Sequence, residues 1–521
     1  MSDSLYRLSY INECGKLTKI SRIRRSRSEW KAKAVSRATQ LRRQRRKSAR
    51  SQKREDVCRL ELEERVSFLE CENAALKSTA APHLPAVGGG DSIDRRRTAC
   101  VMMVIEGTVS FRAVPRIWGV LQRLGWVSIQ IPHFTSVIHW TLRAGMTIFN
   151  EVGPTDEPWL AVIDCSIDIG TRKALVVLRV PLLALHQKQD AIGLQDCECI
   201  GLRIATRWNG PLVKDALVDI FGKAGKPWAI IKDGGTDIKR GVELYREVHD
   251  AEHIQIIEDV GHLAANALKA EFAWRAAFSK FLDITRKGAA RIRQTGLAWL
   301  LPPKVRTKGR FQGITEVAEW AGKLLNLMGG PGRSKNDSEV GMLRKAFHGL
   351  SQLRGFLEQF CATCEVAECF LKLLKREGLN QATGAEAKII LKQLPRDSKA
   401  RARLVSWIDR HLKIQRGLAI GQIPLLVSSD VVESLFGKFK TIVQRNPQAE
   451  LNRLVYTIPL LCGTHTSAEI DRALRGCSHG QMLDQIHKTI PPTLRQQRYR
   501  VLDSASGRVP ETGTRARLEV G

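Results

Sequence analysis

Three acidic residues occupy positions from which carboxylates can hold divalent cations. Asp164 ends the apolar run WLAVID, Asp233 directly follows PWAIIK, and Glu433 begins an amphipathic segment after IPLLVSSD. Carboxylate oxygens suit Mg²⁺ (or Mn²⁺), and two such ions can clamp the attacking and leaving oxygens of a phosphoryl transfer. Lys440 follows Glu433 by seven residues, which places both on one helical face. The pattern predicts a two-metal reaction at a phosphodiester with Lys440 on a phosphate; a solvated lysine is the alternative.

Two of these acids have close competitors in the sequence. Asp168 lies four residues after Asp164 and is the alternative first acid, but Asp164 directly follows the apolar run. Asp237 competes with Asp233, which is favoured because the turn IIKDGG brings the backbone close. We therefore expect Asp164 and Asp233 to act as the ligands.

The starts of two helices hold further candidates. Asp430 competes with Glu433, but it occupies the position of a helix N-cap, and only Glu433 has a basic partner seven residues on. Asp259 and His262 follow the apolar run IQII and are spaced to share a helical face. They are predicted to support the active site, or else to be a helix N-cap with a packed histidine.

Short apolar runs predict the elements that must position these residues. Three successive strands, followed by helices and strands in alternation, indicate a mixed α/β sheet. A long, mostly helical stretch separates this region from Glu433. The expected strands are Trp159–Asp164, Lys173–Val180, Cys199–Ala205, Pro227–Lys232 and Ile254–Glu258.

These segments resemble the DDE transposases of bacterial insertion sequences, which belong to the RNase H-like superfamily together with retroviral integrases. The resemblance rests on VIDCSIDIG, IIKDGGTDIKRG and SSDVVESLFGKFK, and covers roughly residues 155–270 and 415–480. It implies a metal-binding triad of Asp164, Asp233 and Glu433 on an RNase H-like sheet interrupted by a helical insertion. An Asp-x-x-His like Asp259–His262 occurs in several transposase groups. The Tyr and Arg that some groups carry ahead of the Glu are absent, and Leu426 and Ser429 stand at the matching positions.

The charge of the chain indicates a polyanionic partner. The formal net charge is +30, and residues 1–55 hold 18 Lys and Arg against 4 Asp and Glu. This arm is expected to bind phosphate, with a solvated tail as the alternative. Its candidate contacts are Arg42, Arg43, Arg45, Arg46 and Lys47.

Two other N-terminal segments suggest how DNA is bound. Leu62, Leu69 and Leu76 recur every seven residues, as in a short coiled coil, although an amphipathic helix packed on its own chain fits equally well. Between residues 98 and 150 two helices joined by a short turn suit a helix-turn-helix, a pattern that many helical pairs share. The polar residues His133, Thr135 and Ser136 begin its second helix, which we expect to end near Gly145.

The predicted fold is α/β: an RNase H-like mixed-sheet core interrupted by a helical insertion and preceded by an all-helical DNA-binding region. The predicted parts are a basic arm (1–55), a leucine-heptad helix (56–80), a linker (81–97), a helix-turn-helix-like domain (98–150), the first part of the core (155–270), the helical insertion (271–415), the second part of the core with Glu433 (416–490) and a basic tail (491–521).

Cysteines and tryptophans in the insertion are expected to be structural. Cys361, Cys364 and Cys369 lie at helical spacing in an apolar face without a matching second ligand pair, so buried thiols are expected rather than zinc ligands. Core packing is also the expectation for Trp274, Trp299 and Trp320, although an insertion-domain Trp stacks on a flipped base in some transposases. No run approaches the length of a membrane span, and the low cysteine density favours a reducing compartment.

The resemblance implies a DNA transposase that binds terminal inverted repeats, cleaves DNA ends with Mg²⁺ and transfers the strand to target DNA. Its partners would be double-stranded transposon ends and target DNA, with a homodimer or larger synaptic complex and no membrane. The expected location is cytoplasmic, at the bacterial nucleoid. The alternatives are a domesticated, non-enzymatic DNA-binding regulator and an RNase H-like nuclease without strand transfer.

Overall fold

The computed structural model describes residues 91–169, 172–184, 191–249, 251–304, 311, 313–329, 338–443, 451–492, 496–498 and 501–502, without the side chains of 91–94, 166–169 and 338. The basic arm with its five candidate residues, the leucine-heptad helix and most of the linker and tail lie outside the described residues. Within the described ranges, no helix combines the length and the apolar character needed to cross a bilayer.

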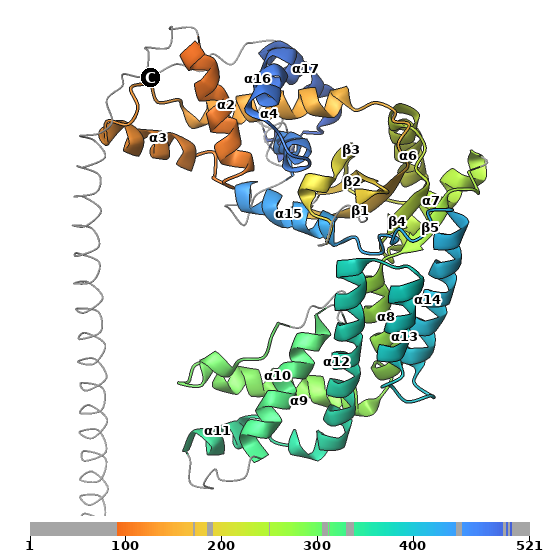
Figure 1. Cartoon of the computed structure of the whole chain (residues 1–521). Helices are drawn as coiled ribbons and strands as arrows, with labels where there is room; N and C mark the ends of the chain where they lie inside the picture. Colours follow the sequence, from red (N-terminus) through yellow and green to blue (C-terminus); the bar gives the residue numbers. More distant parts are fainter. Residues whose placement is uncertain are drawn as a thin grey trace, which may run out of the picture. The chain divides into compact units, whose positions relative to one another are not determined.

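A mixed five-stranded sheet forms the centre of the fold (Figure 1). Its strand order is β3-β2-β1-β4-β5; the first three strands pair antiparallel, whereas β1, β4 and β5 run parallel. This is the order expected of an RNase H-like core, so the predicted fold class is confirmed. The strands are β1 (Trp159–Ile169), β2 (Arg172–Pro181), β3 (Glu198–Ala205), β4 (Ala229–Lys232) and β5 (Gln255–Glu258).

Side-chain alternation along β1 divides the sheet into two buried faces. Trp159 and Ile163 pack into a core with α6 (Gly210–Ala224) and α7 (Thr236–Val248). Leu160 and Val162 belong to the opposite face, whose core includes residues of α4 (Phe134–Glu151), α8 (Val260–Phe272) and α15 (Asp430–Val443). Because Asp164 is two residues after Val162, it lies on this second face.

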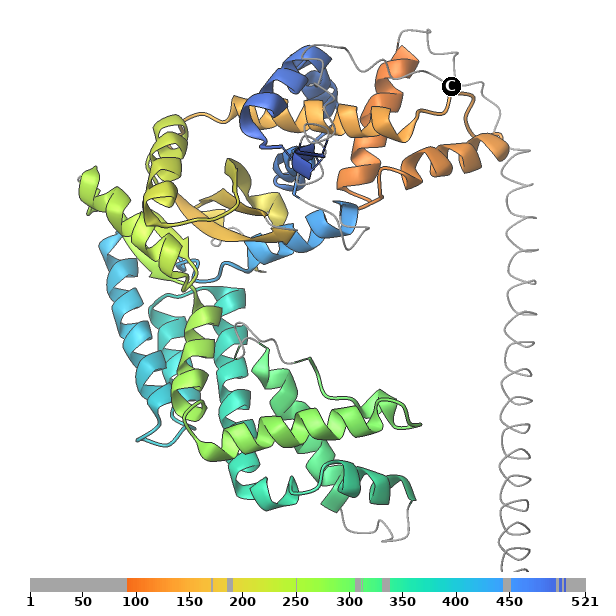
Figure 2. The same ribbon diagram turned by 180° about the vertical axis from the view of Figure 1, so that it is seen from behind.

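Helices from both ends of the described chain pack together beside the sheet (Figure 2). Contacts join α4 to η4, α16 and α17, and α2 to α16. These elements are α2 (Asp91–Ile105), α3 (Ala113–Arg123), α4 (Phe134–Glu151), η4 (Arg453–Leu461), α16 (Ser467–Gly476) and α17 (His479–Thr489).

The prediction that the second helix of the helix-turn-helix-like pair ends near Gly145 was wrong. Helix α4 continues through Gly145 to Glu151. The glycine is needed for a close approach instead, because a Cβ there would lie 1.8 Å from the carbonyl oxygen of Tyr456. His133 caps the start of α4, accepting a hydrogen bond from the Thr135 amide.

The stretch between β5 and Glu433 is helical, as predicted. Its distal helices bury an apolar core of their own, distinct from the two cores of the sheet. The helices are α8 (Val260–Phe272), α9 (Ala276–Ile292), α10 (Ile314–Gly329), α11 (Ser338–Ala346), α12 (Arg354–Glu377), α13 (Gln381–Leu391), α14 (Lys399–Gly417) and α15 (Asp430–Val443). Three-residue 3-10 turns in the described part of the chain are η1 (Leu194–Asp196), η2 (Ala298–Leu300) and η3 (Ser351–Leu353).

Some cysteines and tryptophans of the insertion that were predicted to be buried are exposed. Cys364 is buried, but Cys369 is exposed on the outer side of α12. Trp274 and Trp299 are 67% and 74% exposed, so core packing was the wrong expectation for both. Trp320 is half-buried, and its indole N–H donates to the Leu300 carbonyl.

Candidate active site

Strand pairing places Asp164 and Asp233 next to each other. The parallel register of β1 and β4 ends with Ile163 opposite Lys232. Asp164 directly follows Ile163, and Asp233 directly follows Lys232. Neighbouring strands are about 4.8 Å apart, so both carboxylates arise from one short stretch of the sheet edge. The register of β1 with β2 also shifts just after Asp164, as at a β-bulge, which re-aims the side chains beside it.

A cavity of about 740 Å³ opens at this edge and is lined by both aspartates. Asp164 is only 6% exposed and accepts a hydrogen bond from the Cys165 amide at 2.5 Å. Asp233 accepts one from the Gly235 amide at 2.9 Å. A Cβ at 235 would lie 2.9 Å from the Asp233 carboxylate, so a larger residue there would displace that side chain. The turn predicted from IIKDGG therefore holds Asp233 at the cavity.

The helix that carries Glu433 packs on the same face of the sheet as Asp164. Glu433 lies in the first turn of α15, which packs against β1, and the buried side of that helix joins the core beneath Asp164. Its own side chain is exposed and does not line the cavity. Across the described residues, no group of three His, Cys, Asp or Glu side chains is arranged to hold a metal ion. The structure thus brings two of the predicted acids together and places the third on α15, outside the lining of the cavity.

Asp259 ties the helix that carries Glu433 to the end of β5. It caps α8 by accepting from the His262 amide at 2.7 Å. Its second carboxylate oxygen accepts from the amide of Ser429 at 2.7 Å and from the Ser429 hydroxyl at 3.0 Å. The amide of Val260 also donates to the Val427 carbonyl at 2.9 Å. The N-cap interpretation is correct, and the same carboxylate fixes the segment that enters α15.

The electrostatics of Asp259 and His262 favour a charged pair. Burial opposes ionisation of Asp259, yet hydrogen bonds from His262 and Ser429 lower its pKa below the usual value. The hydrogen bond to Asp259, against the opposing effect of burial, raises the pKa of His262. The charges of Asp259, Asp233 and Asp164 raise it further, so His262 lies within electrostatic reach of the cavity.

The cavity is lined by three carboxylates, those of Asp164, Asp233 and Asp237, and by two cationic side chains, Lys173 and Arg207. Burial raises the pKa of the Cys165 thiol, and the charges of Asp164, Asp233 and Asp237 raise it further, while Lys173 opposes them. Cys165 therefore stays a neutral thiol at physiological pH. In a chain of net charge +30, three carboxylates that act on one thiol mark this cavity as a place suited to cations.

The competing acids lie in different settings. Asp237 is exposed in the first turn of α7 and also lines the cavity. Asp168 lies further along β1, opposite Lys173 and away from the junction with β4. Asp430 is the first residue of α15 rather than the residue before it, and its carboxylate pairs with Lys375 Nζ of α12 at 2.6 Å. The N-cap assignment of Asp430 was therefore wrong, because Ser429 precedes the helix.

Lys440 and Glu433 belong to the single helix α15, as expected from their spacing. Lys440 is half-buried in its last turn. His133, Thr135 and Ser136 lie at the start of α4, where they are exposed or partly exposed. None of these positions is tested for DNA contact, so their roles stay predictions.

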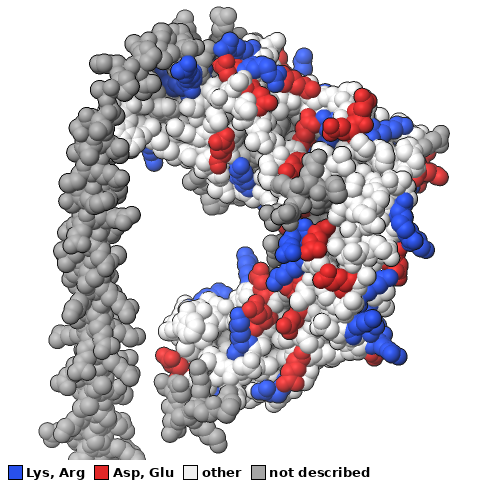
Figure 3. Space-filling model, viewed as in Figure 1, with Lys and Arg blue, Asp and Glu red and all other residues white. Residues whose placement is uncertain are grey.

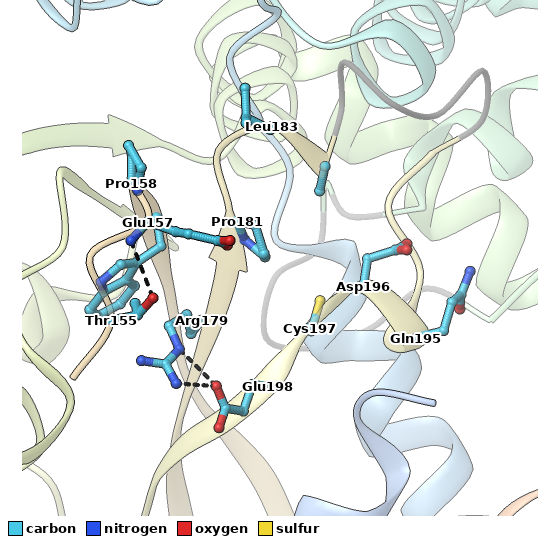
Figure 4. Close-up of a pocket in the computed structure, with 12 residues that line it drawn as sticks. Thr155, Glu157, Pro158, Arg179, Pro181, Leu183, Gln195, Asp196, Cys197 and Glu198 are labelled. Carbon is cyan, nitrogen blue, oxygen red and sulfur yellow. Dashed lines mark hydrogen bonds and ion pairs between the residues drawn. The ribbon is translucent and has the colours of Figure 1, made fainter. Parts of the chain in front are cut away.

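A second cavity of about 740 Å³ lies where β1 begins and β2 ends, away from the two aspartates (Figure 4). Its carboxylate Glu198 is held by Arg179, whose Nε donates at 2.7 Å. The same guanidinium donates to the carbonyl of Gly153 at 2.9 Å. Glu198 and Arg179 are satisfied by each other and by backbone, so this pair is structural. Glu157 and Asp196 also line the cavity.

Comparison with known proteins gives little that bears on function. No protein-family model matches the chain, and no curated protein matches its sequence. Among solved structures, a chain described as "Drosophila P element transposase strand transfer complex" is similar, with 13% sequence identity and a TM-score of 0.38. The match covers 78% of this chain and 100% of that chain.

The sequence did not predict the roles of two residues that contact Asp259 and Asp430. Ser429 stands where some transposase groups carry an Arg, and no sequence signal indicates that it binds Asp259, 170 positions away. Lys375 carried no signal, because it lies in the insertion and reaches Asp430 only after folding.

Proposed function

We propose that this chain is a DNA transposase of the type that bacterial insertion sequences encode. It would bind the ends of a mobile element, cleave them in a metal-dependent reaction and join the freed 3′ ends to target DNA. The observation that carries the proposal is the adjacency of Asp164 and Asp233, at the ends of paired parallel strands, at a cavity that both line together with Asp237.

The donor set fits a hard divalent cation. Asp164 and Asp233 offer carboxylate oxygens, and the nearby thiol of Cys165 is held protonated, so it does not compete as a soft ligand. Glu433 would complete the set from α15. Bound Mg²⁺ or Mn²⁺ would activate water or a 3′-hydroxyl and stabilise the leaving oxygen.

The other residues would orient the reacting parts. Asp259 would hold α15 in register through Ser429, which sets the position of Glu433 relative to Asp164. His262, charged through its pairing with Asp259, would attract the scissile phosphate toward the cavity. Lys440 would bind a backbone phosphate two helical turns from Glu433.

The decisive experiment compares three single carboxylate replacements. Asp164→Asn, Asp233→Asn and Glu433→Gln should each retain DNA binding and lose Mg²⁺-dependent nicking of a duplex that carries the flanks of the gene. Asp219→Asn, which removes an exposed acid of α6, serves as the matched control and should nick normally. A variant that nicks within about tenfold of wild type, about 1.4 kcal/mol in barrier, would remove its residue from the site.

The same assay separates the alternatives. A nuclease without strand transfer would nick but never join the 3′ end to a second duplex, and a regulator would bind without nicking. Asp237→Asn identifies the second ligand, because it should nick normally if Asp233 is the ligand and fail if Asp237 is.

A further inference from the structure

Helix α14 presents a basic groove on the outer side of the insertion. A surface groove of about 710 Å³ is lined by four cationic side chains, of which Arg396 precedes the helix. The outer side of α14 is rich in Lys and Arg in Figure 3. Its sequence KARARLVSWIDRHLKIQRG holds six Lys and Arg against one Asp. The cations of the groove are Arg396, Arg401, Arg410 and Lys413.

Much of this positive charge is not neutralised by the protein. The acid of the groove, Asp409, pairs with Lys388 of α13 at 2.5 Å. Within the described part of the chain, neither Arg396 nor Lys413 forms an ion pair, and both are exposed. Arg401 donates only to a backbone carbonyl, at 3.0 Å. Like charges left together on a folded surface lower stability, so the groove is best explained by an anionic ligand.

The groove is anchored at the edge of the sheet that holds the candidate site. Trp407 donates to the Glu258 carbonyl at 3.2 Å, and the Glu258 amide donates to His411 at 3.0 Å. Arg410 pairs with the Glu258 carboxylate at 3.1 Å. Glu258 ends β5 opposite Lys232, the residue before Asp233. Arg410 is therefore tied to the end of β5, which is one strand spacing, about 5 Å, from the strand that leads to Asp233 and two from the strand that carries Asp164.

We propose that the outer face of α14 binds the phosphate backbone of a DNA duplex that extends from the candidate active site. Arg401 and Lys413 are twelve residues apart, about 18 Å along the helix. That length matches about five base pairs at 3.4 Å each, enough for several phosphates of one strand. The choice of DNA as the polyanion rests on the proposed function.

The test measures DNA binding without cleavage, in full-length Asp233→Asn protein. The groove variant Arg396→Gln/Lys413→Gln is compared with Lys280→Gln/Arg293→Gln, which removes the same charge from an exposed position of α9 and from the exposed residue that follows it. Affinity for a 40-base-pair duplex is measured between 50 and 300 mM KCl. The slope of log affinity against log salt should fall by about 2 in the groove variant, at about 0.9 for each phosphate, and stay unchanged in the control.

A photocrosslinking arm locates the contact. A benzoylphenylalanine at the exposed groove position Ser406 should crosslink to the duplex, and one at exposed Ser279 of α9 should not. Equal slopes for the two double variants, or no DNA crosslink from Ser406, would overturn the proposal. Either result is expected if the groove binds an acidic protein instead of DNA. Nicking by the Asp233-containing protein is scored separately, so failure of the groove and failure of the proposed transposase activity give different results.

Discussion

At the scale of single residues, Asp259 links two elements on which the site depends. It caps α8 and binds Ser429 at the entry to α15, while the imidazole of His262 pairs with it at 3.1 Å. One buried carboxylate with several hydrogen-bond donors is favoured in its charged form. Its replacement should therefore change the electrostatics and the stability of the site together.

Asp259→Asn should lower the pKa of His262 because the charged hydrogen-bond partner is lost. The measurement is an NMR titration of the histidine ring protons. His411 is the internal control, since burial lowers its pKa to about 4 and its partners are Trp407 and the Glu258 amide. An unchanged His262 pKa would mean that the pair is not charged in solution.

The same variant should give a pH-dependent loss of stability. His262 has a raised pKa, so its contribution is complete below the unfolded value of about 6.5 and is lost as pH rises through the folded pKa. Asp259 has a lowered pKa, so its contribution is present above about 3.9 and is lost as pH falls. Asp259→Asn should cost about 2 kcal/mol at pH 6 and less at pH 9, by urea denaturation. Equal losses at the two pH values would contradict the pairing.

At the scale of elements, close packing explains a helix that ignores its glycine. Helix α4 runs through Gly145 because η4 approaches its backbone there. Gly145→Ala should therefore destabilise the protein by about 3 kcal/mol, the upper end of the usual effect of overpacking. Gly222→Ala, at an exposed position of α6 where a Cβ meets no atom within 4 Å, should instead stabilise the protein by about 0.5–1 kcal/mol. Urea denaturation of both variants measures the contrast, and equal effects would show that the approach of η4 is not as described.

Local sequence patterns predicted most elements of the sheet but not the contacts between distant segments. The apolar runs gave all five strands within a few residues, and the resemblance implied the mixed order that the structure has. Strand β1 extends beyond Asp164 because it continues to pair with β2, which the apolar pattern does not encode. The approach of Tyr456 to Gly145 and the bond from Ser429 to Asp259 join residues 311 and 170 positions apart.

The candidate site was predictable to the same extent. Asp164 and Asp233 follow strands that the sequence places in one sheet, so their adjacency follows from parallel pairing. The place of Glu433 depends on how α15 packs after a long insertion, and no local pattern reports that packing. Its exposed side chain leaves the completion of the triad a prediction.

At the scale of the whole molecule, positive charge is concentrated at the N-terminus. Residues 1–55 hold 18 Lys and Arg against 4 Asp and Glu, out of a net +30 for the chain. The described structure begins with α2 at Asp91, so a truncation ending at Gly88 leaves the described elements whole. The arm can therefore be removed without cutting into the sheet or its helices.

Deleting residues 1–88 should weaken DNA affinity and flatten its dependence on salt. Each phosphate contact adds about 0.9 to the slope of log affinity against log salt, so loss of an arm that binds three or four phosphates should lower the slope by about 3. The slope is measured between 50 and 300 mM KCl in the Asp233→Asn background. Circular dichroism at 222 nm, corrected for length, checks that the remaining helices are intact. If the slope of the folded truncation equals that of the full chain, the arm is solvated, and the phosphate contacts must come from the described part of the chain.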